Sequence, residues 1–163
     1  MNNFRNNKSI KSGLSFGFTS GVITTLGLIL GLSASTESKL AIIGGILTIA
    51  FADAMSDSLG IHVSQESEGI KRQKEPWLAA FSTFITKLIS ALTFVVPFLL
   101  LPIFSAVIAC VIWGLFLLVL FSYTLAKETN EKPFLVIREH VSISIIVIIV
   151  STLIGEMLKK YFG

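Results

Sequence analysis

The sequence predicts an all-α integral membrane protein, a bundle of five transmembrane helices. Of its residues, 53% are hydrophobic and 14% are charged, and the mean hydropathy is +0.81. Soluble domains carry about 25% charged residues, so this chain is unusually poor in charge. It also contains five apolar runs that reach the length of about 20 residues needed to span a bilayer as a helix.

The expected helices follow one another through a single transmembrane domain, residues 1–163. They cover about residues 13–34, 40–63, 78–101, 103–125 and 135–158, and residues 64–77 form a short cytoplasmic connection. We expect Pro97 and Pro102 to kink or end the third helix. The competing interpretation of the first run is a signal peptide with a basic start. We prefer a membrane span, because the stretch from Gly13 to Leu32 is already long enough to cross the bilayer.

The basic residues predict the orientation of the bundle. With Lys87 set aside, one side holds nine lysines and arginines, namely Arg5, Lys8, Lys11, Lys71, Arg72, Lys74, Lys127, Lys132 and Arg138. The other side holds three, namely Lys39, Lys159 and Lys160. Because basic loops stay on the cytoplasmic side, we expect a multi-pass protein in membrane lipid with a cytoplasmic N-terminus.

Two carboxylates interrupt the second apolar run. Asp53 and Asp57 are four residues apart, so they share one helix face and repel each other. Each charge costs about 2.5–3.5 kcal/mol at mid-bilayer on insertion scales. The pair therefore predicts a cation or proton site inside the bundle. Lys87 in the third run has two interpretations of equal weight, an ion pair with Asp57 or snorkelling toward the cytoplasm.

Small residues form two stripes in the first run. Gly13, Gly17 and Gly21 form one, and such a stripe lets helix backbones approach closely. We expect this stripe to pack against a second copy in a homodimer. The second stripe contains Ser20, Thr24, Gly27 and Gly31. For Ser20 and Thr24, packing is the simpler interpretation and a ligand role is the alternative.

Several functions have no support in the sequence. His62 and His140 lack a nucleophile at useful spacing, and no glycine-rich phosphate loop is present, so we do not expect an enzyme. The lone Cys110 excludes a disulfide framework. A net charge of +3 indicates loop bias toward the inner leaflet and no nucleic-acid partner.

Segments spread along the chain resemble the vacuolar iron transporter family. Residues 17–28 resemble its first helix, with an apolar run that contains glycine and hydroxyl side chains. Residues 48–56 resemble its second helix, residues 94–102 its proline-containing third, and residues 153–155 the end of its fifth. The resemblance covers nearly the whole chain in order and in number of spans.

This resemblance implies a homodimer of five-helix protomers that exports divalent metal from the cytosol, coupled to protons. The acidic residue of the family's second helix falls on Asp53, and the aspartate of its first helix falls on Ser20. Asp57 is our candidate to replace that missing charge. The family's long glutamate-rich insert is absent, so Glu66 and Glu68 are left as the expected cytoplasmic entrance.

Two function hypotheses follow. The first is a proton-coupled exporter whose metal site comprises Asp53, Asp57, Ser56, Ser20 and Thr24. Such oxygen ligands suit manganese, iron(II) or magnesium, so the divalent cation is a substrate and no cofactor is permanently bound. The second is a non-transporting membrane protein that acts in assembly or regulation, with an acidic pair that is structural and neutralised by Lys87 or by protonation.

Overall fold

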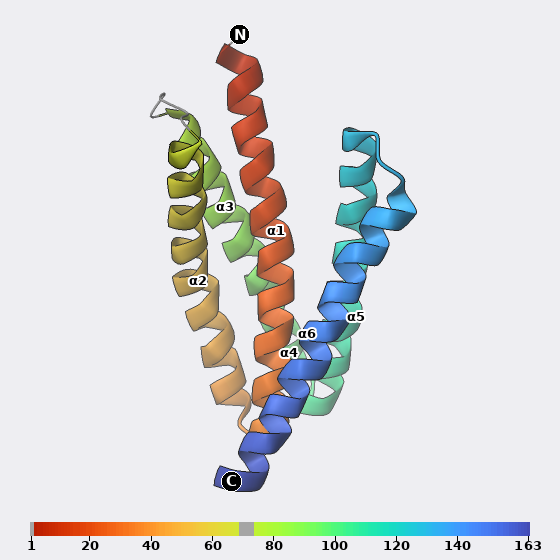
Figure 1. Cartoon of the computed structure of the whole chain (residues 1–163). Helices are drawn as coiled ribbons and strands as arrows, with labels where there is room; N and C mark the ends of the chain where they lie inside the picture. Colours follow the sequence, from red (N-terminus) through yellow and green to blue (C-terminus); the bar gives the residue numbers. More distant parts are fainter. Residues whose placement is uncertain (1, 69–73) are drawn as a thin grey trace.

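The computed structural model describes residues 2–68 and 74–163, with side chains from residue 8 onward, and shows a helical bundle (Figure 1). Its helices are α1 (Asn2–Ser35), α2 (Lys39–Ser67), α3 (Lys74–Thr93), α4 (Val95–Leu100), α5 (Ile103–Thr129) and α6 (Pro133–Phe162). No strand is found in these residues. The predicted all-α fold is therefore confirmed for the described part of the chain.

Five helical segments of the described chain are long and apolar enough to cross a membrane. They are Lys8–Ser35, Lys39–Ser67, Lys74–Leu100, Ile103–Thr129 and Pro133–Phe162. The two termini lie at opposite ends of the bundle (Figure 1), as an odd number of spans requires. A multi-pass membrane protein is the architecture that these segments define.

The helices extend further than the apolar runs do. α1 begins at Asn2, α2 continues to Ser67, and α3 already begins at Lys74. Of the expected connection over residues 64–77, residues 64–67 and 74–77 are therefore helical, and residues 69–73 lie outside the described part of the chain. A helix needs no apolar side chains to continue beyond the bilayer, because its backbone hydrogen bonds are internal. The polar residues that flank the apolar runs therefore continue the same helices.

The third span is broken near its outer end. α3 stops at Thr93 and α4 starts at Val95, and the amide of Phe94 donates to the Ala91 carbonyl at 3.1 Å. Pro97 causes this break, because it has no N–H to donate to the carbonyl of Thr93. Pro102 then precedes the first residue of α5. The expected effects of both prolines are confirmed.

α1 is the central helix, and both of its small-residue stripes contact other helices of the same chain. A Cβ at Gly17 would lie 2.5 Å from the Thr83 carbonyl oxygen of α3. On the other stripe, a Cβ at Gly27 would lie 2.9 Å from Val147 of α6. The stripe of Gly13, Gly17 and Gly21 thus packs against α3 of the same chain. The expectation that this stripe packs against a second copy in a homodimer is corrected. The homodimer itself stays a prediction.

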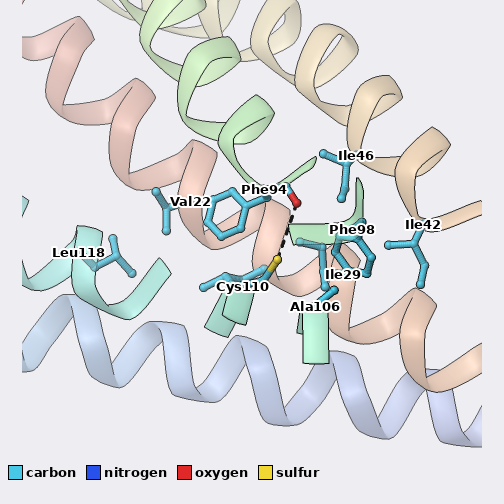
Figure 2. Close-up of a cluster of buried hydrophobic side chains, with 10 residues drawn as sticks. Val22, Ile29, Ile42, Ile46, Phe94, Phe98, Ala106, Cys110 and Leu118 are labelled. Atoms are coloured by element: carbon cyan, nitrogen blue, oxygen red, sulfur yellow. Dashed lines mark hydrogen bonds between the residues drawn. The ribbon is translucent and has the colours of Figure 1, made fainter. Parts of the chain in front are cut away.

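Apolar side chains fill the bundle mainly at the end away from the N-terminus. Figure 2 shows this cluster, to which α1, α2, α4 and α5 contribute, with Val22, Ile29, Ile42, Ile46, Phe94, Phe98, Ala106, Cys110 and Leu118 labelled. The Cys110 thiol donates to the Phe94 carbonyl at 3.7 Å. We call this cluster the apolar core. The interior between the start of α1, the end of α2 and the start of α3 is polar instead.

We expect Gly17→Ala to destabilise the folded protein. The added Cβ meets backbone atoms of Thr83 that cannot turn aside, and overpacking of this kind typically costs about 1–3 kcal/mol. Gly44→Ala is the matched control, because a Cβ there meets nothing within 4 Å. Thermal unfolding in detergent, followed by circular dichroism, measures both. A Gly17→Ala protein that keeps its stability and only loses a dimer would contradict the contact with α3.

Candidate functional site

The acidic residues of α2 meet a lysine of α3 inside the bundle. Lys87 is 1% exposed, and its Nζ lies 2.5 Å from Asp53 Oδ2. The same ammonium forms an ion pair and a hydrogen bond with Asp57 Oδ2. Of the two interpretations of Lys87, the structure shows the ion pair. A buried lysine needs such a partner, because an unpaired charge in a dry interior is very costly.

Ser20 connects α1 to this ion pair. Its hydroxyl accepts a hydrogen bond from Lys87 Nζ at 2.8 Å and donates one to Asp57 Oδ2 at 2.7 Å. We call Ser20, Asp53, Asp57 and Lys87 the acid–lysine cluster. One polar network therefore joins α1, α2 and α3, the three helices that also surround the polar interior.

The charges within the cluster do not balance. With both acids ionised, two carboxylates face one ammonium, so one negative charge is left over. Asp53 Oδ2 is also buried without hydrogen-bond geometry to any described residue, although Lys87 Nζ is near. The Asp53 and Asp57 side chains are 28% and 23% exposed, so the cluster is not sealed. A proton or a second cation would complete the neutralisation.

A cavity of about 510 Å³ leads to the cluster from the N-terminal end of the bundle. α1, α2 and the first turn of α3 form it, and Asp57 contributes to its wall. Its lining residues are Lys8, Ser9, Ser12, Phe16, Asp57, Gly60, Ile61, Ser64, Gln65, Glu68 and Glu75. We call this cavity the vestibule. It gives a route to Asp57, lined by both polar and apolar side chains, from the end of the bundle that the sequence predicts to be cytoplasmic.

The other expected metal ligands lie outside the cluster. The Thr24 hydroxyl donates to the carbonyl of Ser20 at 2.8 Å, within its own helix. Ser56 is exposed on the surface of α2. Within the described residues, no three histidine, cysteine, aspartate or glutamate side chains are grouped closely enough to hold a metal ion. Ser20, Asp53 and Asp57 are the expected ligands that the fold brings together.

The two expected entrance residues have different surroundings. Glu68 ends α2 and lines the vestibule. Glu66 lies beside His62, with 3.3 Å between Glu66 Oε1 and His62 Nε2, and its side chain is 54% exposed. It is not among the residues that line the vestibule. Of the two, Glu68 is therefore the one placed at an entrance.

Two residues of the vestibule were not expected from the sequence. Gln65 is 8% exposed and Glu75 is 4% exposed, although both come from a segment interpreted as a polar connection. Gln65 follows Asp57 by eight residues, which places it about 80° around the helix from Asp57 at 100° per residue. The helical wheel of the acidic face therefore does not mark Gln65. No pattern marks Glu75 either, which looks like an ordinary loop charge.

No protein-family model matches this sequence, and no curated protein matches it either. The resemblance to vacuolar iron transporters therefore stays a prediction from the motifs. What the fold and the cluster define is a class, a polytopic helical membrane protein with a charged network inside its bundle.

We expect Lys87→Met to destabilise the protein strongly, because two carboxylates lose their only cation in the cluster. Breaking a buried ion pair costs about 3–5 kcal/mol. Adding Asp53→Asn and Asp57→Asn to the same chain should restore much of that loss, since no unpaired charge remains. Lys11→Met is the matched control, because its partner Glu128 is exposed and a surface pair contributes about 0–1 kcal/mol. Equal losses in unfolding temperature for Lys87→Met and Lys11→Met would show that the cluster has no structural importance.

Proposed function

We propose that the protein is a membrane transporter that exports a divalent metal ion, iron(II) or manganese, from the cytosol in exchange for protons. The acid–lysine cluster is the proposed exchange site. The observation that supports this most strongly is a charged network in the bundle, next to a vestibule with three acidic lining residues, Asp57, Glu68 and Glu75. Ionisable groups inside a membrane are expensive, and they typically mark ion pathways and proton relays.

Lys87 is the resident cation in this proposal. Its ammonium occupies the space between the two carboxylates, which are also the best oxygen ligands for a metal ion. Two like unit charges at 4 Å repel by about 4 kcal/mol at an effective dielectric constant of 20. A divalent ion can therefore bind only if the Lys87 ammonium moves away from the two carboxylates. Because carboxylates must be deprotonated to hold a metal ion, metal binding and proton release at this acidic pair are coupled.

The ligand set within reach is small and made of hard oxygens. The two carboxylates and the Ser20 hydroxyl supply protein ligands, and water from the vestibule would complete the shell. Magnesium-like and manganese-like ions tolerate several bound waters. Thr24 and Ser56 would join the shell only after a rearrangement of α1 or α2. The resemblance to the vacuolar iron transporters supports the same class of cargo.

The alternative is a non-transporting membrane protein whose cluster is structural. One observation favours it, because Lys87 is almost fully buried and its contacts join three helices without any further ion. In that case the network serves assembly of the bundle, and metal ions have no effect on the protein.

The proposal places the N-terminus in the cytosol, and single cysteines test this. Glu37 lies between α1 and α2 with a side chain that is 90% exposed, and Glu131 is exposed between α5 and α6. We expect Glu37→Cys to react with a membrane-impermeant maleimide from outside only, and Glu131→Cys from the cytosol only. The native Cys110 is buried and should give little background. Reversed labelling of the two positions would overturn the orientation and the direction of transport.

Asp53→Asn distinguishes transport from a structural role. This change keeps the shape of the side chain and leaves a neutral pair of Asp57 and Lys87, so folding should survive. Loss of even half of an attraction of about 4 kcal/mol lowers metal affinity more than tenfold. We expect Mn²⁺ to raise the unfolding temperature of the wild type much more than that of Asp53→Asn. Uptake of Mn²⁺ into proteoliposomes with a pH gradient should fall in parallel.

Glu131→Gln is the control for that experiment, because it removes one exposed carboxylate far from the cluster in sequence. Its metal response should equal that of the wild type. An equal shift in wild type and Asp53→Asn would remove Asp53 from the site, and no shift in either would favour the non-transporting alternative.

A further inference from the structure

Two residues that line the vestibule carry buried oxygens that take no part in the acid–lysine cluster. Oε1 of Gln65 and Oε1 of Glu75 are both buried and accept no hydrogen bond from any residue that the structure describes. Both side chains are more than nine-tenths buried, and both residues line the cavity. Leaving such an acceptor unpaired destabilises the fold, and more so when the group is charged. A missing partner that supplies positive charge or donors would remove this penalty.

From this we propose a second cation site in the vestibule, formed by Glu75 and Gln65 with Glu68, which holds a hydrated divalent ion. Its role as the first binding site on the path of the ion to the acid–lysine cluster rests on the proposed function. Binding of the ion to this site does not depend on the proposed function. Carboxylate and amide oxygens are hard ligands of the kind that manganese and magnesium prefer.

The charges along the vestibule favour a cation. Asp57, Glu68 and Glu75 line it together with one lysine, Lys8. Asp57 is already paired with Lys87, so among the described lining residues Glu68 and Glu75 face one ammonium, that of Lys8. Lys8 is exposed, and a long lysine side chain can turn toward bulk water when another cation enters.

The size of the vestibule suits an ion that keeps its water shell. Its volume is about 510 Å³, whereas six waters at the liquid value of about 30 Å³ each need roughly 180 Å³. Ser9, Ser12 and Ser64 are also among the residues that line the space. Waters of a bound ion would find donors and acceptors there, so dehydration is not required at this first site.

The fold explains why these residues meet. Gln65 lies in the last turn of α2, and Glu75 lies in the first turn of α3. Both ends close against the start of α1, where Ser9 is buried. The three helix ends thus form the mouth of the cavity, and Asp57 lies deeper along α2.

Binding of Mn²⁺ to the purified full chain in detergent, measured by electron paramagnetic resonance, tests this site. We expect Glu75→Gln to lower the affinity of one class of Mn²⁺ site at least tenfold. Gln65→Glu adds a carboxylate to the same wall and should raise that affinity, so it decides the outcome if Glu75→Gln does not fold. Glu131→Gln, an exposed acid outside the vestibule, is the control and should bind as the wild type does.

Asp53→Asn separates this site from the proposed exchange site, because Asp53 does not line the vestibule. Mn²⁺ binding that depends on Glu75 should persist in Asp53→Asn. This holds even if Mn²⁺ uptake by Asp53→Asn equals that of the wild type and so shows no role for the cluster in transport. Wild-type affinity in Glu75→Gln, or an equal loss in Glu131→Gln, would overturn the vestibule site. Neither of these binding results would change the conclusion drawn from Mn²⁺ uptake by Asp53→Asn, which tests the proposed exchange site separately.

Discussion

The ion pairs of Lys87 with Asp53 and Asp57 are the constraint on which the arrangement of α1, α2 and α3 depends. Three charged groups inside an apolar bundle are tolerable only in mutual contact, so α2 and α3 cannot separate without exposing them to hydrocarbon. Ser20 extends the constraint to α1, because its hydroxyl hydrogen bonds to both partners. The ion pairs therefore determine which faces of the three helices point inward.

The close approach of α1 to α3 makes this network possible. A Cβ at Gly21 would lie 2.4 Å from Ser90 Oγ and 3.1 Å from Lys87 Cγ. Only a residue without a side chain leaves α1 near enough for Ser20, one position earlier, to reach the lysine. Packing and electrostatics thus act together, since the small-residue stripe provides the distance and the hydrogen bonds provide the direction.

Much of the fold could be predicted from the sequence, because membrane spans depend on local length and apolarity. Five apolar runs and two prolines were enough for the helices and for the break before α4. The acidic pair could be found for the same reason, as a charge is conspicuous in an apolar run. The partner of the stripe of Gly13, Gly17 and Gly21 could not be predicted from the sequence. A stripe of small residues indicates close helix packing, but it does not indicate whether the partner helix belongs to the same chain.

The vestibule shows the same limit. Gln65 and Glu75 are ordinary polar residues in sequence, and they become unusual only when three helix ends enclose them. Burial is a property of tertiary structure, so composition alone gave no reason to separate Glu75 from the exposed acids around it. Glu68 was expected at the entrance, together with Glu66, as an acid of the short connection between the second and third spans.

The division of the interior into a polar half and an apolar core also has an electrical consequence. In the proposed orientation, a water-filled vestibule would conduct the cytosolic potential as far as Asp57, so most of the membrane voltage would fall across the apolar core around Phe94 and Phe98. Entry of an ion from the cytosol would then be nearly insensitive to voltage. Passage beyond the cluster would carry almost the full electrical work, about 2.3 kcal/mol per unit charge for each 100 mV. In the proposed orientation, protons that move inward through the same core would recover that work charge for charge.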